Sequence, residues 1–399
     1  MKSATRWMNW NGCWDCKADK NAERKMWKKE SGSIRVCRDE NMEKVKLSDI
    51  CNPKQWKTIP TGDLLDEGYP VYGANGIIGY YSEYNHETPV VAVTCRGATC
   101  GSLNITVPNA YVTGNAMCLD EVRNDVNINY LYYCLKHYDF NNVISGSAQP
   151  QITRQGMDKI FISICCHDKQ CEIVDRLKKI ENVIDLRKRE IVLLDNLIKA
   201  RFVEMFANWK KKYLAEPLGE YLQDITYGFT NPMPDAEEGP WKITAKDVVN
   251  GIVNLDTARK TLQESYDKLT EKSKPQLGDV LLTKDGTLGR TAVVEIGGMC
   301  VNQSVAVLRI NEKILPKYLS ILLQMPKYQR DMIADAGGGT IKHIYITKVV
   351  KMPIVVPSIE EQNTFLDFVN QVDKSKVAVQ KALDEAQLLF DSLMQQYFG

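Results

Sequence analysis

Two long stretches of the chain repeat hydrophobic residues every three or four positions, which is the spacing of one helix face. The first begins at Ile173 and is interrupted at Arg187 and Arg201, and the second begins at Phe365 and is interrupted at Lys376. Alternating steps of four and three residues are typical of a coiled-coil seam. The predicted seam residues are Leu177, Ile180, Ile184, Ile191, Leu194 and Ile198 in the first helix, and Val369, Val372, Val379, Leu383 and Phe390 in the second.

Each predicted helix has an apolar stripe that must be covered. Because the chain supplies two such stripes, we expect the helices to pack on each other in antiparallel orientation. This pairing leaves Leu186, Leu193 and Leu197 for contact with another protein. A helix of about 40 residues is about 60 Å long, so it is a spacer as well as a core element.

Short apolar runs separated by glycine-rich turns lie outside the long helices and indicate mixed α/β structure. Predicted strands are 90–93, 160–162, 279–283 and 305–310, and predicted short helices are 45–51, 129–137 and 316–324.

One part of the chain occurs twice. Residues 145–206 align without a gap on residues 337–398, at a constant offset of 192 residues, so that Gln170 falls on Gln362 and Phe206 on Phe398. A period this long, present twice, indicates a pseudo-dimer within one chain rather than a solenoid. The predicted fold class is α/β (α+β) with a pseudo-two-fold repeat. Its parts are an N-terminal extension (1–41), a first domain (42–166), a first long helix (167–215), a second domain (216–357) and a second long helix (358–399).

Composition is that of an ordinary soluble protein, with 44% hydrophobic and 25% charged residues. No apolar run is long enough for a membrane span, and the first 30 residues lack the apolar core of a secretory signal, so we expect a cytoplasmic protein. The formal net charge of +1 gives no global argument for nucleic-acid binding. Any DNA-binding surface must be a local patch or be completed by a partner.

The 12 cysteines are scattered through apolar segments and are interpreted as reduced and mostly buried. Cys13 and Cys16 form a C-x-x-C pair in the extension, with Cys37 and Cys51 as conceivable further zinc ligands. A zinc ribbon would show two tight pairs, so no metal site is predicted.

Motifs for catalysis are absent from the sequence. It has neither the G-x-x-x-x-G-K-[ST] phosphate loop nor G-x-G-x-x-G, and Asn52-Pro53 and Asn231-Pro232 fail the amino-methyltransferase pattern. The four histidines are not paired at metal or triad spacing. Asp235 lies in an acidic loop without the closing Glu-x-Lys of a nuclease site. Nucleotide binding is therefore not expected.

Four phrases point to a family: YPVYGANGIIGYY at 69–81, VVAVTCRGATCG at 90–101, SGSAQPQIT at 145–153 and PSIEEQ at 357–362. Together with the duplication, they closely resemble the specificity subunit of type I restriction-modification systems. The resemblance covers roughly residues 42–399. In the first copy, Cys165-Cys166-His167 departs from the Pro357-Ser358 phrase of the second.

This resemblance implies two target-recognition domains, each reading one half of a split double-stranded DNA sequence and held apart by the two helices. The subunit itself would be non-catalytic and would have no cofactor of its own. It would dock two methyltransferase subunits, with restriction subunits joining, and S-adenosylmethionine and ATP/Mg would bind only in those partners. A four-residue insertion near Ile184 is then expected to change the spacer between half-sites.

Polar loop residues beside glycine are the candidates for DNA contact, because glycine lets the backbone approach and their side chains can bind base edges or phosphates. Tyr72, Tyr80 and Tyr81 are open to stacking on DNA or to core packing. The DNA-binding candidates are Arg96, Ser147, Gln149, Gln151 and Arg154 in the first domain, and Lys284, Arg290, Lys342 and His343 in the second.

Two other functions stay open at this point. One is the recognition subunit of a related system with a fused methyltransferase-nuclease, and the other is a coiled-coil scaffold with carbohydrate- or protein-binding domains and no role on DNA.

Overall fold

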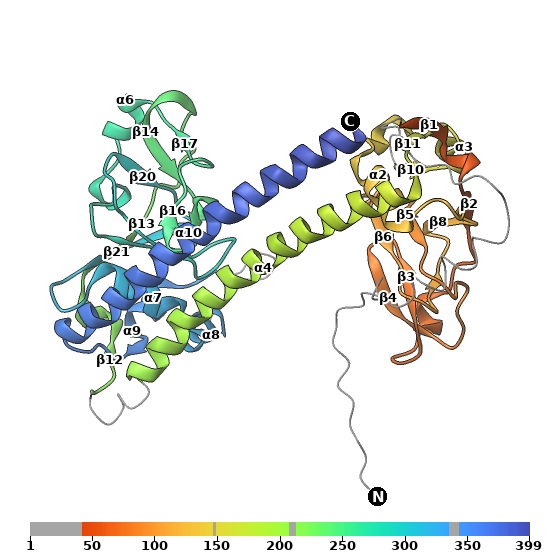
Figure 1. The fold of residues 1–399 in the computed structure, drawn as a ribbon. Helices are drawn as coiled ribbons and strands as arrows, with labels where there is room; N and C mark the ends of the chain where they lie inside the picture. The colour runs from red at the N-terminus through yellow and green to blue at the C-terminus, as the bar shows by residue number, and fades with distance from the viewer. Residues whose placement is uncertain (1–41, 147–148, 207–212, 335–342) are drawn as a thin grey trace, which may run out of the picture. The chain divides into compact units, whose positions relative to one another are not determined.

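The computed structural model describes residues 42–146, 149–206, 213–334 and 343–399, which form two compact units (Figure 1). The first unit comprises the described residues up to Lys178 together with Asp391–Gly399, and the second comprises Lys179–Phe390. Each unit contains one α/β domain and parts of both long helices. Among the helices described, none is long and apolar enough to cross a membrane.

The first domain is built on a four-stranded antiparallel sheet in the order β2-β8-β5-β6 and a three-stranded sheet in the order β4-β3-β7. Helix α2 packs beside β5 and β6 (Figure 1). Two short pairs, β1 with β11 and β9 with β10, complete it. The bounds are β1 Glu43–Lys46, β2 Asn52–Gln55, β3 Tyr69–Gly73, β4 Gly76–Tyr81, β5 Val91–Thr94, β6 Leu103–Ile105, β7 Tyr111–Val112, β8 Ala116–Asp120, α2 Ile128–His137, β9 Ile144–Ser145, β10 Gln151–Ile152, α3 Arg154–Met157 and β11 Phe161–Ile164.

The second domain repeats this plan. Its four-stranded sheet has the order β13-β21-β18-β19, and its three-stranded sheet β17-β14-β20 again contains one parallel and one antiparallel pair. The bounds are β12 Glu216–Pro217, β13 Leu222–Tyr227, β14 Ala236–Ile243, β15 Val248–Val249, β16 Ile252–Val253, β17 Arg259–Lys260, α6 Gln263–Asp267, β18 Val280–Thr283, β19 Thr291–Val293, β20 Met299–Val301, β21 Val305–Ile310, α7 Pro316–Gln324, α8 Pro326–Ala334, α9 Ile346–Lys351 and β22 Pro353–Ile354.

The predicted mixed α/β class is confirmed, and the strand at 305–310 and the helix at 316–324 have the predicted bounds. The helix predicted at 45–51 is wrong. Residues Glu43–Lys46 form strand β1, which pairs with β11, and only Leu47–Asp49 turn as a short 3-10 helix. Pairing with β11 wins because Val45 lies opposite Ile162 and the Leu47 N–H donates to the Ile160 carbonyl at 2.9 Å.

Two 40-residue helices, α4 (His167–Phe206) and α10 (Ile359–Phe398), are antiparallel. In the first unit, the start of α4 meets the end of α10, where Arg176 donates to the Tyr397 hydroxyl at 3.2 Å. In the second unit, the Phe202 and Phe365 rings lie 5.4 Å apart, at the end of α4 and the start of α10.

The structure places the predicted seam residues as follows. Leu177, Ile184, Ile198, Val369, Val372, Val379 and Phe390 are buried, whereas Ile180, Ile191, Leu194 and Leu383 are half-buried.

Two of the three interruptions in the seam, Lys376 and Arg201, make contacts between the helices. Lys376 in α10 forms an ion pair with Asp195 of α4 at 2.6 Å and approaches Asp373 on its own helix at 3.5 Å. The Arg201 guanidinium lies 5.6 Å from the centre of the Phe368 ring. A polar residue at a seam position specifies the register of two helices, because a shifted register would leave it unpaired.

An aromatic contact joins each domain to the end of the long helix that comes from the other half of the sequence. Tyr130 of α2 packs edge-on against Phe398 at 5.4 Å, and Tyr318 of α7 packs edge-on against Phe206 at 5.9 Å. Both tyrosines are fully buried. The alignment of Phe206 with Phe398 in the sequence thus corresponds to the same contact made twice.

A buried glutamine fixes the start of α4 to the first domain. Gln170 is 0% exposed. Its Oε1 atom accepts from the backbone N–H of Asn127 at 2.8 Å, and its Nε2 atom donates to the carbonyls of Cys165 at 2.8 Å and Asp125 at 3.0 Å.

Gln362, at the start of α10, makes the same three hydrogen bonds in the second domain. Its Oε1 atom accepts from the Leu315 N–H at 2.8 Å, and its Nε2 atom donates to the carbonyls of Pro357 at 2.9 Å and Lys313 at 3.1 Å. Gln362 is likewise 0% exposed. In both units, one glutamine side chain therefore hydrogen-bonds to two backbone segments. One is the segment just before the long helix (α4 or α10), and the other is the loop before the short helix of the domain (α2 or α7).

We predict that Gln362→Leu lowers the free energy of unfolding by about 1–3 kcal/mol, because the half-buried Leu315 N–H and the carbonyls of Pro357 and Lys313 lose the partner that the buried Gln362 amide provides. Urea unfolding of the full chain measures the change. Gln371→Leu, an exposed glutamine on the same helix, is the matched control. Equal stabilities of the two variants would contradict a role for the buried hydrogen bonds.

Candidate nucleic-acid interface

Two of the predicted residues of the first domain, Arg96 and Gln151, lie directly opposite each other. They form an antiparallel bridge, which is held by hydrogen bonds from Ile152 N–H to the Cys95 carbonyl at 3.0 Å and from Gly97 N–H to the Pro150 carbonyl at 3.1 Å. Both side chains are exposed. Arg96 and Gln151 are called the first corner below.

The other candidates of the first domain lie around this corner. Gln149 is exposed two residues before Gln151. Arg154 is also exposed, and its Nη2 atom donates to Oδ1 of Asn52 at 2.9 Å, so the guanidinium is held over the first residue of β2. Ser147 of the first domain and Lys342 of the second lie outside the described residues.

The second domain brings His343 beside Asp285, a residue that sequence reasoning missed. The two form an antiparallel bridge, and Nδ1 of His343 lies 2.6 Å from Oδ1 of Asp285. Lys284 Nζ donates to the other carboxylate oxygen at 2.8 Å. Asp285 and His343 are called the second corner. Aligning Thr283-Lys284-Asp285-Gly286 with Thr94-Cys95-Arg96-Gly97 would have matched Asp285 to Arg96 and so could have identified this carboxylate.

Lys284 and Arg290 differ in availability. The Lys284 side chain is only 16% exposed, and its ammonium lies 5.3 Å from the centre of the Tyr227 ring, so it is engaged within the protein. Arg290 is exposed, while its backbone N–H donates to the Thr283 hydroxyl at 2.9 Å. Of these two cations, Arg290 is the one placed to reach a ligand.

A glycine follows each corner because the backbone there turns with positive φ. The φ angles are +86° at Gly97 and +77° at Gly286, a region that side-chain-bearing residues rarely adopt. A Cβ atom at either position would meet no atom within 4 Å. Conformation rather than lack of space therefore favours glycine.

The tip of the β3-β4 hairpin lies next to the first corner, because the Thr94 hydroxyl donates to the carbonyl of Ala74 at the turn. Ile77 and Ile78 beyond this turn are 52% and 46% exposed. These isoleucines are a second feature that the sequence analysis missed. The turn of the hairpin thus contacts the end of strand β5, two residues before Arg96.

The three tyrosines that were open to stacking or core packing have different environments. Tyr72 is buried, and its hydroxyl accepts from the Val107 N–H at 3.2 Å. Tyr80 is 38% exposed, and Tyr81 is half-buried edge-on against Tyr111 at 5.8 Å. Tyr72 is therefore a core residue, and Tyr80 has the most accessible ring of the three.

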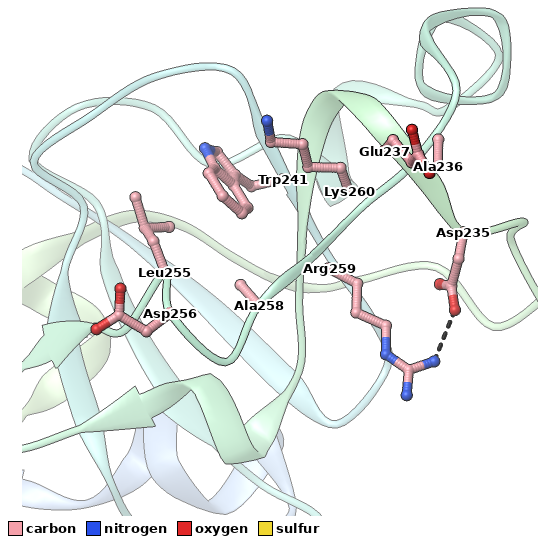
Figure 2. Close-up of a pocket in the computed structure, with 9 residues that line it drawn as sticks. All are labelled: Asp235, Ala236, Glu237, Trp241, Leu255, Asp256, Ala258, Arg259 and Lys260. Atoms are coloured by element: carbon pink, nitrogen blue, oxygen red, sulfur yellow. Dashed lines mark hydrogen bonds and ion pairs between the residues drawn. The ribbon is translucent and has the colours of Figure 1, made fainter.

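An open pocket of about 380 Å³ lies in the second domain beside the acidic loop (Figure 2). Three of its charged groups are engaged within the protein, since Arg259 forms an ion pair with Asp235 at 2.6 Å and Lys260 lies 4.8 Å from the centre of the Trp241 indole. Hydrogen bonds from Lys242 and Arg259 lower the pKa of the Asp235 carboxyl. Asp235 is thus an ionised partner of two cations, as expected for a solvated loop and not for a catalytic acid.

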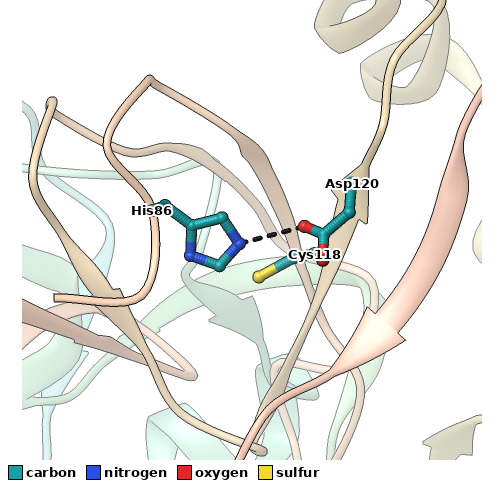
Figure 3. Close-up of side chains that lie close together, drawn as sticks. All are labelled: His86, Cys118 and Asp120. Carbon is teal, nitrogen blue, oxygen red and sulfur yellow. Dashed lines mark hydrogen bonds and ion pairs between the residues drawn. The ribbon is translucent and has the colours of Figure 1, made fainter.

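His86, Cys118 and Asp120 of the first domain place potential metal-ligand atoms within 4.8 Å of one another (Figure 3). The Asp120 carboxylate contacts His86 Nε2 at 2.9 Å and accepts from the Trp56 indole N–H at 3.0 Å, while His86 Nδ1 lies 2.6 Å from Oδ1 of Asn85. Burial, together with the Asp120 carboxylate, raises the pKa of the Cys118 thiol, which favours the protonated form. These contacts are those of a hydrogen-bonded network that joins β8 to a loop.

Cys51, the one described member of the conceivable zinc set, is buried and donates to the Leu47 carbonyl at 3.3 Å. Burial and the Asp120 carboxylate raise its thiol pKa to about 12, so the thiolate needed for zinc binding is disfavoured. Cys13, Cys16 and Cys37 lie outside the described residues.

Comparison with known proteins agrees with this architecture. The family model of the type I restriction modification DNA specificity domain matches residues 39–196 and 232–386. A putative type I restriction enzyme specificity subunit of Haemophilus influenzae is 23% identical over 327 residues, which are 79% of this chain and 83% of that protein. The EcoBI specificity subunit of Escherichia coli is 28% identical over 174 residues, or 43% of this chain and 36% of that protein.

Among solved structures, the S subunit of a type I restriction-modification system from M. genitalium has the same fold. Its TM-score is 0.53 at 16% identity, over 92% of this chain and 98% of that one. Because the family model matches both copies of the repeat and more than half of the chain, the chain belongs to the family of type I restriction-modification DNA specificity domains.

Proposed function

We propose that each of the two domains reads one half of a split double-stranded DNA target, through a surface centred on its corner. The chain is the recognition subunit of a type I restriction-modification complex and not itself the enzyme. The observation that carries the proposal is that the first and second corners share one backbone hydrogen bond beside the bridge, from Ile152 N–H to the Cys95 carbonyl and from Ile344 N–H to the Lys284 carbonyl, and present different side chains. Such a pair suits two readers of one design that recognise different sequences.

The small net charge of +1 limits how much affinity the chain alone gains from DNA phosphates. We therefore propose that partner subunits contribute a large share of the phosphate contacts, while the chain selects the sequence. S-adenosylmethionine and ATP/Mg are assigned to those methyltransferase and restriction subunits, and the chain itself is assigned no cofactor. The proposed location, with the host DNA, is the cytoplasm.

The exposed face of α4 is the proposed docking surface for methyltransferase subunits. Leu186, Leu193 and Leu197 are 63%, 65% and 46% exposed and are spaced seven and four residues apart, so they form one stripe. Near its end, Leu197 and Phe368 line an apolar groove together with Ala200, Arg201 and Glu204. An exposed apolar stripe beside a groove fits a helix of a partner protein.

We predict that a host carrying the complete system methylates one two-part DNA motif, and that Gln149→Ala combined with Gln151→Ala relaxes one half of it. Loss of a base contact relaxes specificity at its own position, whereas loss of a phosphate contact weakens all sites alike. Mapping methylated adenines across the host genome shows which motif positions are required and how completely the sites are methylated. An unchanged motif in the double variant would remove this loop from the interface.

We predict that Leu186→Ser combined with Leu193→Ser abolishes co-purification with the methyltransferase subunit while leaving thermal unfolding of the isolated chain unchanged. Exposed leucines add little to folding, whereas a partner that covers them buries their apolar area. Leu277→Ser, an exposed leucine of the second domain, is the matched control. Normal co-purification of the double variant would place the docking surface elsewhere.

We predict that inserting one heptad after Ile184 in α4 and one at the matching level of α10, near Leu388, lengthens the spacer between the two half-sites. Seven residues keep the seam intact and add about 10 Å of helix, the rise of about three base pairs. Methylation mapping gives the spacer directly. Retention of the original spacer with both half-sites intact would show that the helices do not set it.

A further inference from the structure

The two corners occupy the same position in the two copies of the repeat. Ile152 N–H donates to the Cys95 carbonyl at 3.0 Å, and Ile344 N–H donates to the Lys284 carbonyl at 2.9 Å. The bridged residues lie next to these hydrogen bonds, one directly after the acceptor residue and the other directly before the donor residue. The first bridge is Arg96 with Gln151, and the second is Asp285 with His343.

The turns that follow the corners are closed by the same kind of hydrogen bond, although the first turn is one residue longer. Gly101 N–H donates to the Thr94 carbonyl at 2.8 Å, and Gly289 N–H donates to the Thr283 carbonyl at 2.8 Å. Thr94 and Thr283 end the central strands β5 and β18, and both are fully buried. A buried strand and a closed turn thus hold each corner at the same place on its domain.

The chemistry presented at this shared position differs between the domains. Side chains of residues bridged in an antiparallel pair lie on the same face. The first corner presents a guanidinium and an amide, groups that pair with guanine O6 and N7 or with adenine N6 and N7. The second corner presents an imidazole whose Nδ1 atom faces a carboxylate.

Asp285 fixes how His343 is presented. An ionised carboxylate can only accept, so the contact of 2.6 Å between Oδ1 and Nδ1 places a proton on Nδ1. In the neutral ring, Nε2 is then an acceptor, and among the described residues nothing donates to it or accepts from it. The His343 side chain is 44% exposed, compared with 18% for Asp285, so the ring and not the carboxylate is accessible.

We propose that His343, oriented by Asp285, reads a base of the second half-site through its Nε2 atom, at the position that Arg96 and Gln151 occupy for the first half-site. In the neutral form of the ring, Nε2 accepts from an amino group, so this form recognises adenine through N6 or cytosine through N4 in the major groove. Asp285 acts as a positioning residue. This inference rests on the proposed function of the two domains.

A phosphate is a poorer fit for the second corner. Phosphate oxygens are anionic acceptors and would be repelled by the carboxylate of Asp285, and the nearby Lys284 ammonium is already paired with it at 2.8 Å. An exocyclic amino group carries no charge and supplies the N–H that Nε2 needs. The second corner therefore suits a base edge.

A reciprocal exchange in the complete complex tests the inference. Asp285→Arg with His343→Gln moves the first corner's side chains into the second domain, and Arg96→Asp with Gln151→His does the reverse. Each exchange is expected to alter the methylated motif at one position in its own half-site, with about 5- to 150-fold discrimination at the affected base. The other half-site must stay unchanged and serves as the internal control for assembly.

Single substitutions separate reading from positioning. Asp285→Asn keeps an oxygen that can accept from Nδ1 and is expected to retain the motif, whereas Asp285→Ala is expected to relax the same base position as His343→Gln. Glu295→Gln, an exposed loop residue of the second domain, is the control with no expected effect. If the exchanged pair does not assemble, His343→Gln alone is evaluated in the same way.

Three results would overturn the inference. They are an unchanged motif in both exchanges, a uniform weakening of all sites with a shallower salt dependence, and a complete loss of methylation by an intact complex. The first leaves the proposed function standing, because the wild-type chain still specifies a two-part motif. Absence of any two-part motif with the wild-type chain would instead contradict the proposed function itself.

Discussion

The arrangement of each domain on its helix depends on one buried polar contact, the glutamine at the start of the long helix. A buried amide with three partners is costly to disturb, because any rotation of the helix start away from the domain leaves backbone groups without hydrogen bonds in a dry environment. Gln170 and Gln362 therefore fix the orientation of the helix start relative to the domain as well as its contact with the domain. Apolar packing alone would tolerate small rotations, since it has no directional requirement. The corners that carry the proposed recognition chemistry inherit their orientation from this constraint.

The pairing of the helices combines apolar contacts with polar contacts that select the register. Seven of the eleven predicted seam residues are buried, which supplies the area that holds the helices together. An apolar seam by itself permits a shift by one heptad at little cost. The Lys376 to Asp195 ion pair does not, because the shift would separate the charges. The edge-on contacts of Tyr130 with Phe398 and of Tyr318 with Phe206 also oppose such a shift, because it would separate the two rings of each pair.

The sequence predicted best where periodicity and burial agree, as in the long helices and in β21 and α7. It failed at residues 45–51, where Val45 and Lys46 belong to strand β1 and only Leu47–Asp49 turn as a 3-10 helix, because only the fold reveals that β11 offers a partner edge. For the candidate site, the sequence analysis named individual residues but did not predict which of them face each other. Arg96 and Gln151 are 55 residues apart in the sequence, and no local pattern indicates that they face each other. Asp285 was missed because an acidic residue is an unexpected choice for a DNA-facing loop until its contact with His343 is visible.

The duplication has kept backbone interactions and changed side chains at the corners, and this division has a physical basis. Backbone hydrogen bonds of a closed turn do not depend on the identity of the exposed residue, so Arg96 can correspond to Asp285 without a change in the fold. A buried residue such as Gln362 has no such freedom, because each of its hydrogen-bonding atoms has a fixed partner. Exposure thus determines which positions can diverge. A recognition domain built on a closed turn can acquire a new base preference at the cost of very little stability, whereas its attachment to the helix must stay the same.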